Sequence, residues 1–156
     1  YMGLFQISNE PGFLTPTLYN YVGRPDKTAE VVRKTLKERY NTTKEGIPGN
    51  DDSGSMSSWY VFHALGFYPN TGQDLYLISS PTFEEAVIHL ENGRDLSIKA
   101  KKASDKNIYV QSVKLNGEPL DACSFKHTDI ANGGTLEFVM GSKPSKWGTV
   151  GVENQL

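Results

Sequence analysis

Two short polar segments of this sequence carry the residue types that can bind a cation or move a proton. One is the acidic turn Asn50-Asp51-Asp52, inside the stretch GIPGNDDSG, and the other is Asn9-Glu10, just before a proline. Carboxylate and amide oxygens are the ligands that a hard cation such as Ca²⁺ prefers. An ionised carboxylate can also act as a general base. The two segments therefore indicate a cation site or a site of proton transfer, although acids and amides are also common in ordinary turns and loops.

The acidic turn lies at the expected start of a helix, where acids also occur for purely structural reasons. We expect this helix over residues 54–65, with Ser53 as its N-cap and Gly66 at its end. Because one side-chain cap is enough, Asp51 and Asp52 would be free for another role. The helix N-terminus would also favour the ionised form of Asp52, which a general base or a cation ligand requires.

Two further helical segments come before the acidic turn. A short one starts at Thr15-Pro16 and stops at Gly23, and a longer one covers residues 25–40. Four apolar residues of the longer helix fall on one face: Ala29, Val32, Leu36 and Tyr40. The segment 54–65 is apolar nearly all round, which is typical of a buried helix. Burying it would need more helices than these two, so we expect the helical part of the chain to be incomplete.

From residue 74 onward the apolar residues alternate with a period of two. Short β-branched or aromatic runs, such as DLYLISS, LSIKAKK, NIYVQSVKL and TLEFVMG, are separated by turn signals of the Asn-Gly and Gly-Gly kind. This pattern predicts five or six strands in a small antiparallel sandwich or sheet, with an irregular tail from residue 142. The predicted class is therefore α+β, with helices in residues 1–72 and β-structure in residues 73–156.

Composition narrows the class of protein. The 156 residues hold 16 Lys and Arg against 18 Asp and Glu, so there is no basic surface to indicate nucleic acid. No run is apolar enough to span a bilayer. The single Cys123 excludes an internal disulfide and a cysteine-based zinc site. The sequon at Asn41 fits secretion. We expect no functional role for the three histidines, and His63 is predicted to be a core residue with satisfied hydrogen bonds.

Two longer segments carry a family resemblance. NEP…LYNYVGRPDKT and GIPGNDDSGSMSSWYVFHALGFYPNTGQDLYLISSP resemble the C-terminal part of glycoside hydrolase family 92, and the resemblance covers about residues 2–140. The family consists mainly of calcium-dependent, exo-acting α-mannosidases that invert the anomeric configuration, many of them acting on α-1,2 linkages. The resemblance implies that residues 1–72 are the tail of an (α/α)6 catalytic barrel and that residues 73–156 are C-terminal β-structure.

The resemblance also implies a role for each polar residue. Asp52 is the expected general base, and Asp51 and Asn50 support it in the catalytic turn. Asn9 and Glu10 belong to the sugar- and calcium-binding region. The expected calcium ligands are Asn9, Glu10 and Asp52, and the expected substrate-binding residues are Asn9, Glu10 and Asn50.

The chain departs from the family pattern in several places. The family's general acid lies upstream of the NEP segment, so we expect this chain alone to have no turnover and to need the remainder of a parent chain. Many members have Ser-His-His after NEP, where this chain has Gly12-Phe13-Leu14. Ser55 stands where many members have Gln. These differences leave the glycan linkage open.

The leading interpretation is an incomplete, secreted or periplasmic α-mannosidase, but other classes of protein also fit the sequence. A non-catalytic carbohydrate- or calcium-binding module would fold alone and show measurable sugar affinity. A structural β-domain with a helical arm is a third interpretation. A helical-barrel glycosidase acting on glucose satisfies the same chemistry, but the GNDDSG block argues against it.

Overall fold

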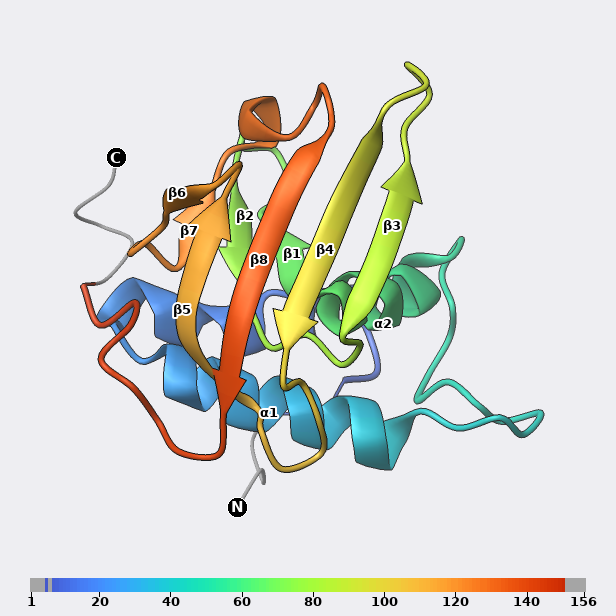
Figure 1. Cartoon of the computed structure of the whole chain (residues 1–156). Helices are drawn as coiled ribbons and strands as arrows, with labels where there is room; N and C mark the ends of the chain where they lie inside the picture. The colour runs from blue at the N-terminus through green and yellow to red at the C-terminus, as the bar shows by residue number, and fades with distance from the viewer. Residues whose placement is uncertain (1–4, 6, 151–156) are drawn as a thin grey trace.

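In the computed structural model, helices come first and strands follow (Figure 1). The structure describes residue 5 and residues 7–150. The helical part consists of two 3₁₀ helices, η1 (Glu10–Gly12) and η2 (Thr15–Val22), and two α-helices, α1 (Pro25–Arg39) and α2 (Ser55–Leu65). The predicted α+β class is confirmed. The short helix starting at Thr15 is a 3₁₀ helix, and Gly23 ends it with a φ of 66°.

Within residue 5 and residues 7–150, eight strands form two sheets. The three-stranded sheet has the order β1 (Phe67–Pro69), β2 (Tyr76–Ile78), β7 (Ser124–Phe125). The five-stranded sheet has the order β3 (Glu85–His89), β4 (Asp95–Lys101), β8 (Gly134–Gly141), β5 (Tyr109–Leu115), β6 (Glu118–Pro119). A third 3₁₀ helix, η3 (His127–Asp129), precedes β8. The expected boundary between residues 72 and 73 falls in the turn that joins β1 to β2, and these two strands pair.

The five-stranded sheet is mixed, so the prediction of purely antiparallel pairing was wrong. Strand β8 pairs with β4 in parallel and with β5 antiparallel. The reason is topological. Strands β4 and β5 run in opposite directions, so a strand inserted between them has to be parallel to one of the two.

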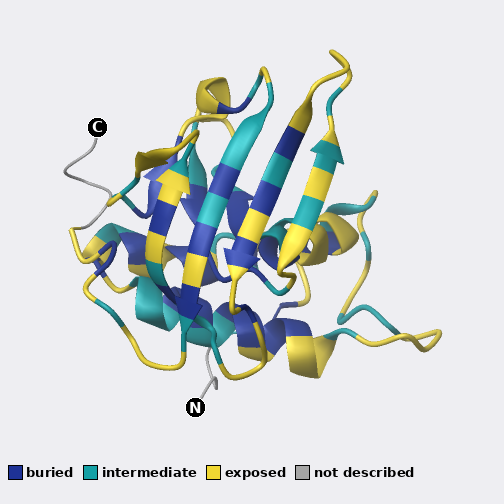
Figure 2. Cartoon of the chain, viewed as in Figure 1, coloured by how far each residue is buried: buried dark blue, intermediate teal, exposed yellow. Residues whose placement is uncertain are grey.

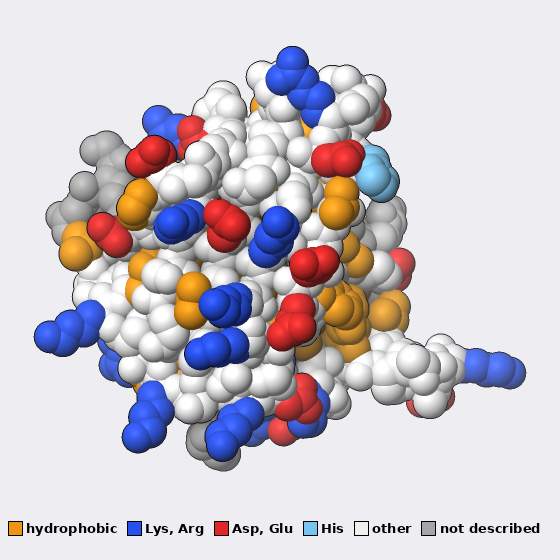
Figure 3. Space-filling view, in the orientation of Figure 1, with side chains coloured by type: hydrophobic (Ala, Val, Ile, Leu, Met, Phe, Trp, Pro, Cys, Tyr) orange, Lys and Arg blue, Asp and Glu red, His pale blue; other side chains and the backbone are white. Residues whose placement is uncertain are grey.

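The sheet has one buried and one exposed face. Burial alternates along β4 and β8, as Figure 2 shows. The inward residues are Leu96, Ile98 and Ala100 on β4 and Leu136, Phe138 and Met140 on β8. The outer face carries Lys and Arg interspersed with Asp and Glu (Figure 3), a pattern typical of a solvated surface.

Buried polar side chains connect the helical part to the β part. The Asn20 amide nitrogen donates to the backbone carbonyls of Ile78 (2.7 Å) and Cys123 (3.2 Å), and its oxygen accepts from the Thr28 hydroxyl (2.8 Å). The Arg33 guanidinium on α1 donates to the carbonyl of Pro81 at 2.7 Å. Because an unpaired buried polar group costs free energy, these bonds fix the two parts against each other.

The segment from residue 142 to residue 150 has no helix or strand, as predicted, but it packs against the body of the protein. Trp147 is buried and its indole nitrogen donates to the Leu120 carbonyl at 2.7 Å. Gly148 lies against Pro25 at the start of α1. The segment therefore covers part of the junction between helices and sheets.

Candidate active site

The acidic turn ends in a left-handed curl of the backbone. Asp52, Ser53 and Gly54 have φ values of 48°, 60° and 91°. L-residues rarely adopt this conformation, and among the described non-glycine residues it occurs at only two other positions, Lys102 and Asn116. The curl brings the carbonyl of Asp51 to the backbone N–H of Met56 at 3.1 Å, so that the turn folds back onto the first turn of α2.

Asp51 caps α2, and the prediction that Ser53 does so was wrong. The Asp51 Oδ1 accepts from both the backbone N–H and the hydroxyl of Ser57, each at 2.8 Å. Gly54 occupies the N-cap position and Ser53 is exposed. The left-handed φ values explain why Asp51 and not Ser53 is the cap. They turn the backbone so that the Asp51 side chain faces the free N–H groups of the first turn and Ser53 does not.

Asp52 lies close to Glu10, although 42 positions separate the two residues in the sequence. Partial loss of solvation raises the pKa of the Asp52 carboxyl, and the charge of Glu10 and a hydrogen bond with its side chain raise it further. This direction is opposite to the one expected from the helix N-terminus. A pair of carboxyl groups in contact is an arrangement that a bound cation would stabilise and that repels itself without one.

The remaining predicted site residues are sequence neighbours of this pair. Asn9 caps η1 through a bond from the Glu10 backbone N–H to its Oδ1 at 3.0 Å, which leaves the second lone pair of that oxygen available. Asn50 is exposed in the acidic turn. Within residues 5 and 7–150, no three His, Cys, Asp or Glu side chains come close enough to hold a metal ion by themselves.

The segment around Glu10 and the acidic turn are held together by contacts that the sequence did not reveal. Gly49 lies so close to the backbone of Ser8 that a Cβ on it would be 2.4 Å from the Ser8 carbonyl oxygen. The Trp59 indole nitrogen on α2 donates to the Phe13 carbonyl at 3.0 Å. The buried residues of this region form one hydrophobic cluster: Ile7, Phe13, Val32, Leu36, Met56, Trp59 and Tyr68. Of these residues, Gly49 has the plainest sequence feature, because it is a glycine directly before the acidic turn and glycine permits close approach of two backbones.

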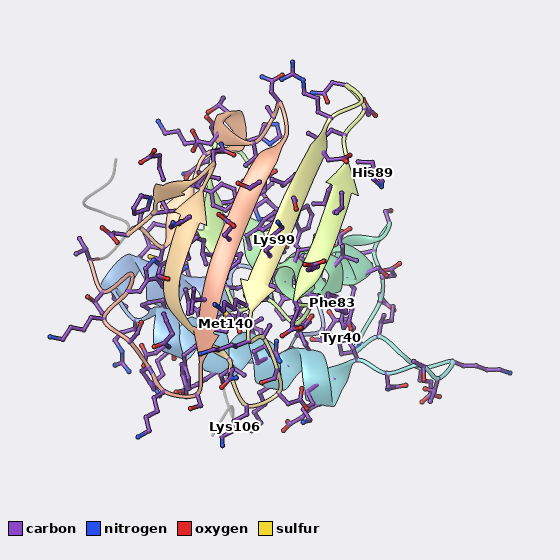
Figure 4. The ribbon with its side chains drawn as sticks, viewed as in Figure 1. Tyr40, Phe83, His89, Lys99, Lys106 and Met140 are labelled. Atoms are coloured by element: carbon purple, nitrogen blue, oxygen red, sulfur yellow. The ribbon has the colours of Figure 1, made fainter. Side chains whose placement is uncertain are left out.

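Aromatic rings stack behind the site. Tyr40, which ends α1 and is labelled in Figure 4, stacks on Trp59 with a centroid distance of 5.9 Å and an interplanar angle of 3°. Its hydroxyl donates to the carbonyl of Met56 at 3.1 Å. Trp59 is completely buried and acts as core, Tyr68 is buried except where it borders a hollow, and Tyr60 is 37% exposed.

His63 is buried in this stack, between Trp59 (centroids 4.2 Å apart) and Tyr68 (4.7 Å). The prediction that its hydrogen bonds are satisfied was wrong, because neither ring nitrogen has a partner in the described part of the chain. Burial lowers the pKa of His63 to about 3. The imidazole is therefore neutral at physiological pH, and its ring packs in the core between Trp59 and Tyr68.

A hollow of about 530 Å³ borders Glu10 and Ser53, the residue after Asp52. It lies between η1, the first half of α2 and the end of β1, and its lining includes Glu10, Ser58, Phe62, Tyr68 and Asn70. Its size falls in the range of small-molecule sites. Aromatic walls with hydroxyl, amide and carboxyl groups at the rim suit a polyhydroxylated ligand such as a sugar.

Helix α2 is only partly buried, since Tyr60 and Val61 are exposed, so the expectation of a helix buried nearly all round does not hold for this chain. A carboxyl pair at the N-terminus of α2, beside a hollow with polar and aromatic walls, fits the class of glycoside hydrolases. The family model of the glycosyl hydrolase family 92 catalytic domain matches residues 1–142, and the chain belongs to this family. This confirms the family predicted from the resemblance of the two segments that begin with NEP and with GIPGNDDSG.

Several known proteins are similar to this chain. An uncharacterized secreted glycosidase of Arthroderma benhamiae is 40% identical over 149 residues, which is 94% of this chain and 19% of the relative. The family GH92 alpha-mannosidase BT3965 of Bacteroides thetaiotaomicron superposes with a TM-score of 0.92 at 35% identity, covering 98% of this chain and 21% of that one. The family GH92 inverting mannosidase BT2199 of the same organism gives 0.86 at 34% identity, covering 95% and 20%. The chain thus spans about a fifth of the length of these relatives.

Proposed function

We propose that this chain is part of an inverting α-mannosidase that removes terminal, α-1,2-linked mannose from glycans. The proposal is supported by membership of family 92 and by two relatives, one named as an α-mannosidase in complex with mannoimidazole and the other as an inverting mannosidase. The observation that carries it is the contact between Glu10 and Asp52 at the N-terminus of α2.

Asp52 is the general base in this proposal. A raised pKa brings a carboxylate closer to the operating pH, which suits it to take a proton from the attacking water. Glu10 is not the general acid, because two carboxyl groups in hydrogen-bond contact are closer than the roughly 6.5–9.5 Å that separates acid and base in inverting glycosidases. The acid then comes from outside this chain, and Asn9, Glu10 and Asn50 bind sugar hydroxyls.

Asn9, Glu10 and Asp52 would also hold a calcium ion. Their oxygens are the right chemistry, but three residues supply fewer than the about six to eight oxygen ligands that Ca²⁺ takes, so water, the sugar or other parts of the protein complete the set. Bound calcium would screen the two carboxylates from each other and orient the hydroxyl groups of the mannose ring. Asp51 would contribute by holding the turn through its bonds to Ser57.

The remainder of a parent chain belongs to the proposal as well. It would supply an N-terminal β-sandwich and the other helices of an (α/α)6 barrel, of which residues 1–72 would be the tail and residues 73–156 the following β-structure. Secretion is supported by the relative from Arthroderma. Among the described residues no helix is long and apolar enough to cross a membrane.

The test is an assay of the parent enzyme and of the 156-residue chain on aryl α-mannosides and α-1,2-mannobiose. We expect the parent to release mannose first as the β-anomer, to lose activity with a calcium chelator and to recover it with Ca²⁺, and the chain alone to be inactive. Release of the α-anomer, or full activity after prolonged chelation, would contradict the inverting mechanism or the calcium site respectively. Turnover by the chain alone would contradict the assignment of the acid to another part of the protein.

A further inference from the structure

We propose that Trp59 and Gly49 are positioning residues: they hold the segment around Glu10 against the acidic turn and so determine where Glu10 lies relative to Asp52. The inference rests on the proposed function of the Glu10 and Asp52 pair. Neither Trp59 nor Gly49 is a ligand or a proton donor in it. Both act through the backbone of the segment that carries Glu10.

Trp59 connects this segment to α2. The side chain is completely buried, and its indole N–H donates to the Phe13 carbonyl at 3.0 Å. The backbone N–H of Phe13 in turn donates to the Glu10 carbonyl at 3.0 Å and closes η1. A continuous series of hydrogen bonds therefore runs from α2 through Phe13 to Glu10.

The same helix fixes the other carboxyl group. Asp51 is bonded to Ser57 in the first turn of α2, and Asp52 follows Asp51 directly. Trp59 lies two residues after Ser57. Helix α2 therefore positions both carboxyl groups of the pair. It positions Asp52 through the bonds of Asp51, and it positions Glu10 through the bond from Trp59.

Gly49 provides a second, independent link. Its backbone meets the backbone of Ser8, and a Cβ at this position would come within 2.4 Å of the Ser8 carbonyl oxygen. Real Cβ atoms do not approach an oxygen so closely, so any other residue would push the two segments apart. Ser8 is two positions before Glu10, so that displacement would reach the carboxyl pair.

The chain offers a matched control for each link. Trp147, the other tryptophan, is also buried and also donates to a backbone carbonyl, that of Leu120 at 2.7 Å, but it lies against the β part. Gly46 would also place a Cβ 2.4 Å from a backbone oxygen, that of Asn41, within its own loop. The comparisons are therefore Trp59→Phe with Trp147→Phe, and Gly49→Ala with Gly46→Ala.

The experiment measures calcium activation and hydrogen–deuterium exchange of the four variants in the parent enzyme. We expect Trp59→Phe and Gly49→Ala each to raise the Ca²⁺ concentration for half-maximal activity about 10-fold or more, since residues that orient ligands typically have such effects. The turnover number at saturating Ca²⁺ should change much less. Exchange of the backbone amides in residues 7–14 should become faster in these two variants. Both controls should lose thermal stability to a similar extent with unchanged calcium activation and unchanged exchange in residues 7–14.

Three results would overturn the inference. The first is a Trp59→Phe or Gly49→Ala variant whose calcium activation moves no more than that of its control. The second is unchanged exchange in residues 7–14. The third is an equal shift in all four variants, which would show a general loss of stability. If Trp59→Phe does not fold, the glycine pair decides. An unmodified parent enzyme without calcium dependence would overturn the proposed function instead, and the exchange data would still test whether the two links hold the segment.

Discussion

The region around α2 and the five-stranded sheet differ in how the side chains of their left-handed residues are bonded. Both contain a non-glycine residue in the left-handed conformation, Asp52 before α2 and Asn116 in the turn after β5. The Asn116 side chain is fully used: its oxygen accepts from the Thr135 N–H (2.9 Å) and its nitrogen donates to the Asp129 carbonyl (3.1 Å). The Asp52 carboxyl instead meets another carboxyl, that of Glu10.

The two regions differ in their buried polar groups as well. In the described part of the chain, the buried side-chain atoms without a hydrogen-bond partner belong to Thr35, His63 and Ser79, all outside the five-stranded sheet. An unpaired buried polar group costs about 1–3 kcal/mol. Among the described residues, the unpaired buried side-chain atoms therefore lie outside the five-stranded sheet, whereas left-handed non-glycine residues occur both before α2 (Asp52, Ser53) and in the sheet's turns (Lys102, Asn116). The difference between the two regions lies in how their polar side chains are paired and not in backbone strain.

The largest expected effect is that of Asp52→Asn in the parent enzyme. If Asp52 is the base, kcat should fall by about 10²–10⁴-fold, the usual contribution of general-base catalysis. Asp121→Asn, an exposed acid in the loop between β6 and β7, serves as the control and should leave kcat unchanged. The measurement is steady-state kinetics on an aryl α-mannoside. Near-normal turnover of Asp52→Asn would contradict the assignment of Asp52 as the base, and the Asp52 turn would then be as purely structural as the Asn116 turn.

The next effect concerns the unpaired imidazole of His63. Burial lowers its pKa from 6.5 to about 3, so the unfolded chain binds a proton more tightly than the folded one. Stability is therefore fully present above pH 6.5 and is lost as the pH falls from 6.5 toward 3, by about 3 kcal/mol at pH 4.5.

The measurement for this prediction is denaturant unfolding between pH 7 and pH 4.5. Carboxyl groups also titrate toward the acid end, so the comparison is with His63→Phe, which should lose that part of the pH dependence, and with His89→Gln, an exposed control that should keep it. Equal pH profiles of the unmodified chain and His63→Phe would show that His63 is solvated or paired in solution.

A smaller effect is expected for Asp51→Asn. The variant keeps an oxygen that can accept from Ser57 but loses the charge that strengthens both bonds, so unfolding should become easier by about 1 kcal/mol, as for other helix caps. Loss of kcat should be smaller than for Asp52→Asn and should grow with temperature. Melting temperature and kcat are measured together. A greater loss of turnover in Asp51→Asn than in Asp52→Asn would mean that the base is Asp51.

The smallest effect is expected for Ser53→Ala. Because Ser53 does not cap α2, the free energy of unfolding should change by no more than about 0.5 kcal/mol, as for other surface substitutions. Asp51→Ala provides the contrast in the same melting experiment. A loss of stability from Ser53→Ala comparable to that from Asp51→Ala would restore Ser53 as the cap.

The sequence predicted what depends on neighbouring residues. Gly23 and Gly66 end their helices as expected, because a left-handed residue at a helix end is a local requirement that glycine meets best. Most strands after residue 74 were also predicted, since alternation of apolar residues is a local pattern. The predicted number of five or six was too low, because the described residues after 74 form seven strands, β2–β8, and the two-residue β7 is too short to show alternation. That Asp51 and not Ser53 caps α2 was not predictable, because neither residue type indicates a left-handed backbone conformation.

Features that depend on distant residues could not be predicted from local patterns. The parallel pairing of β4 with β8 follows from the order of strands in the sheet. The bond from Trp59 to the Phe13 carbonyl joins residues 46 positions apart. The grouping of Glu10 with the acidic turn was expected from the resemblance to family 92, since composition and spacing alone left both segments as separate loops.

The buried amide of Asn20 and the guanidinium of Arg33 have a consequence for how the chain melts. Asn20 needs the carbonyls of Ile78 and Cys123, which lie side by side in the three-stranded sheet region, and Arg33 needs that of Pro81. If residues 73–156 came away first, the helical part would be left with several buried donors facing nothing. Unfolding of the β-structure alone therefore costs free energy, and we expect helices and sheets to melt in a single cooperative transition. The helical part depends on the β-structure for its stability.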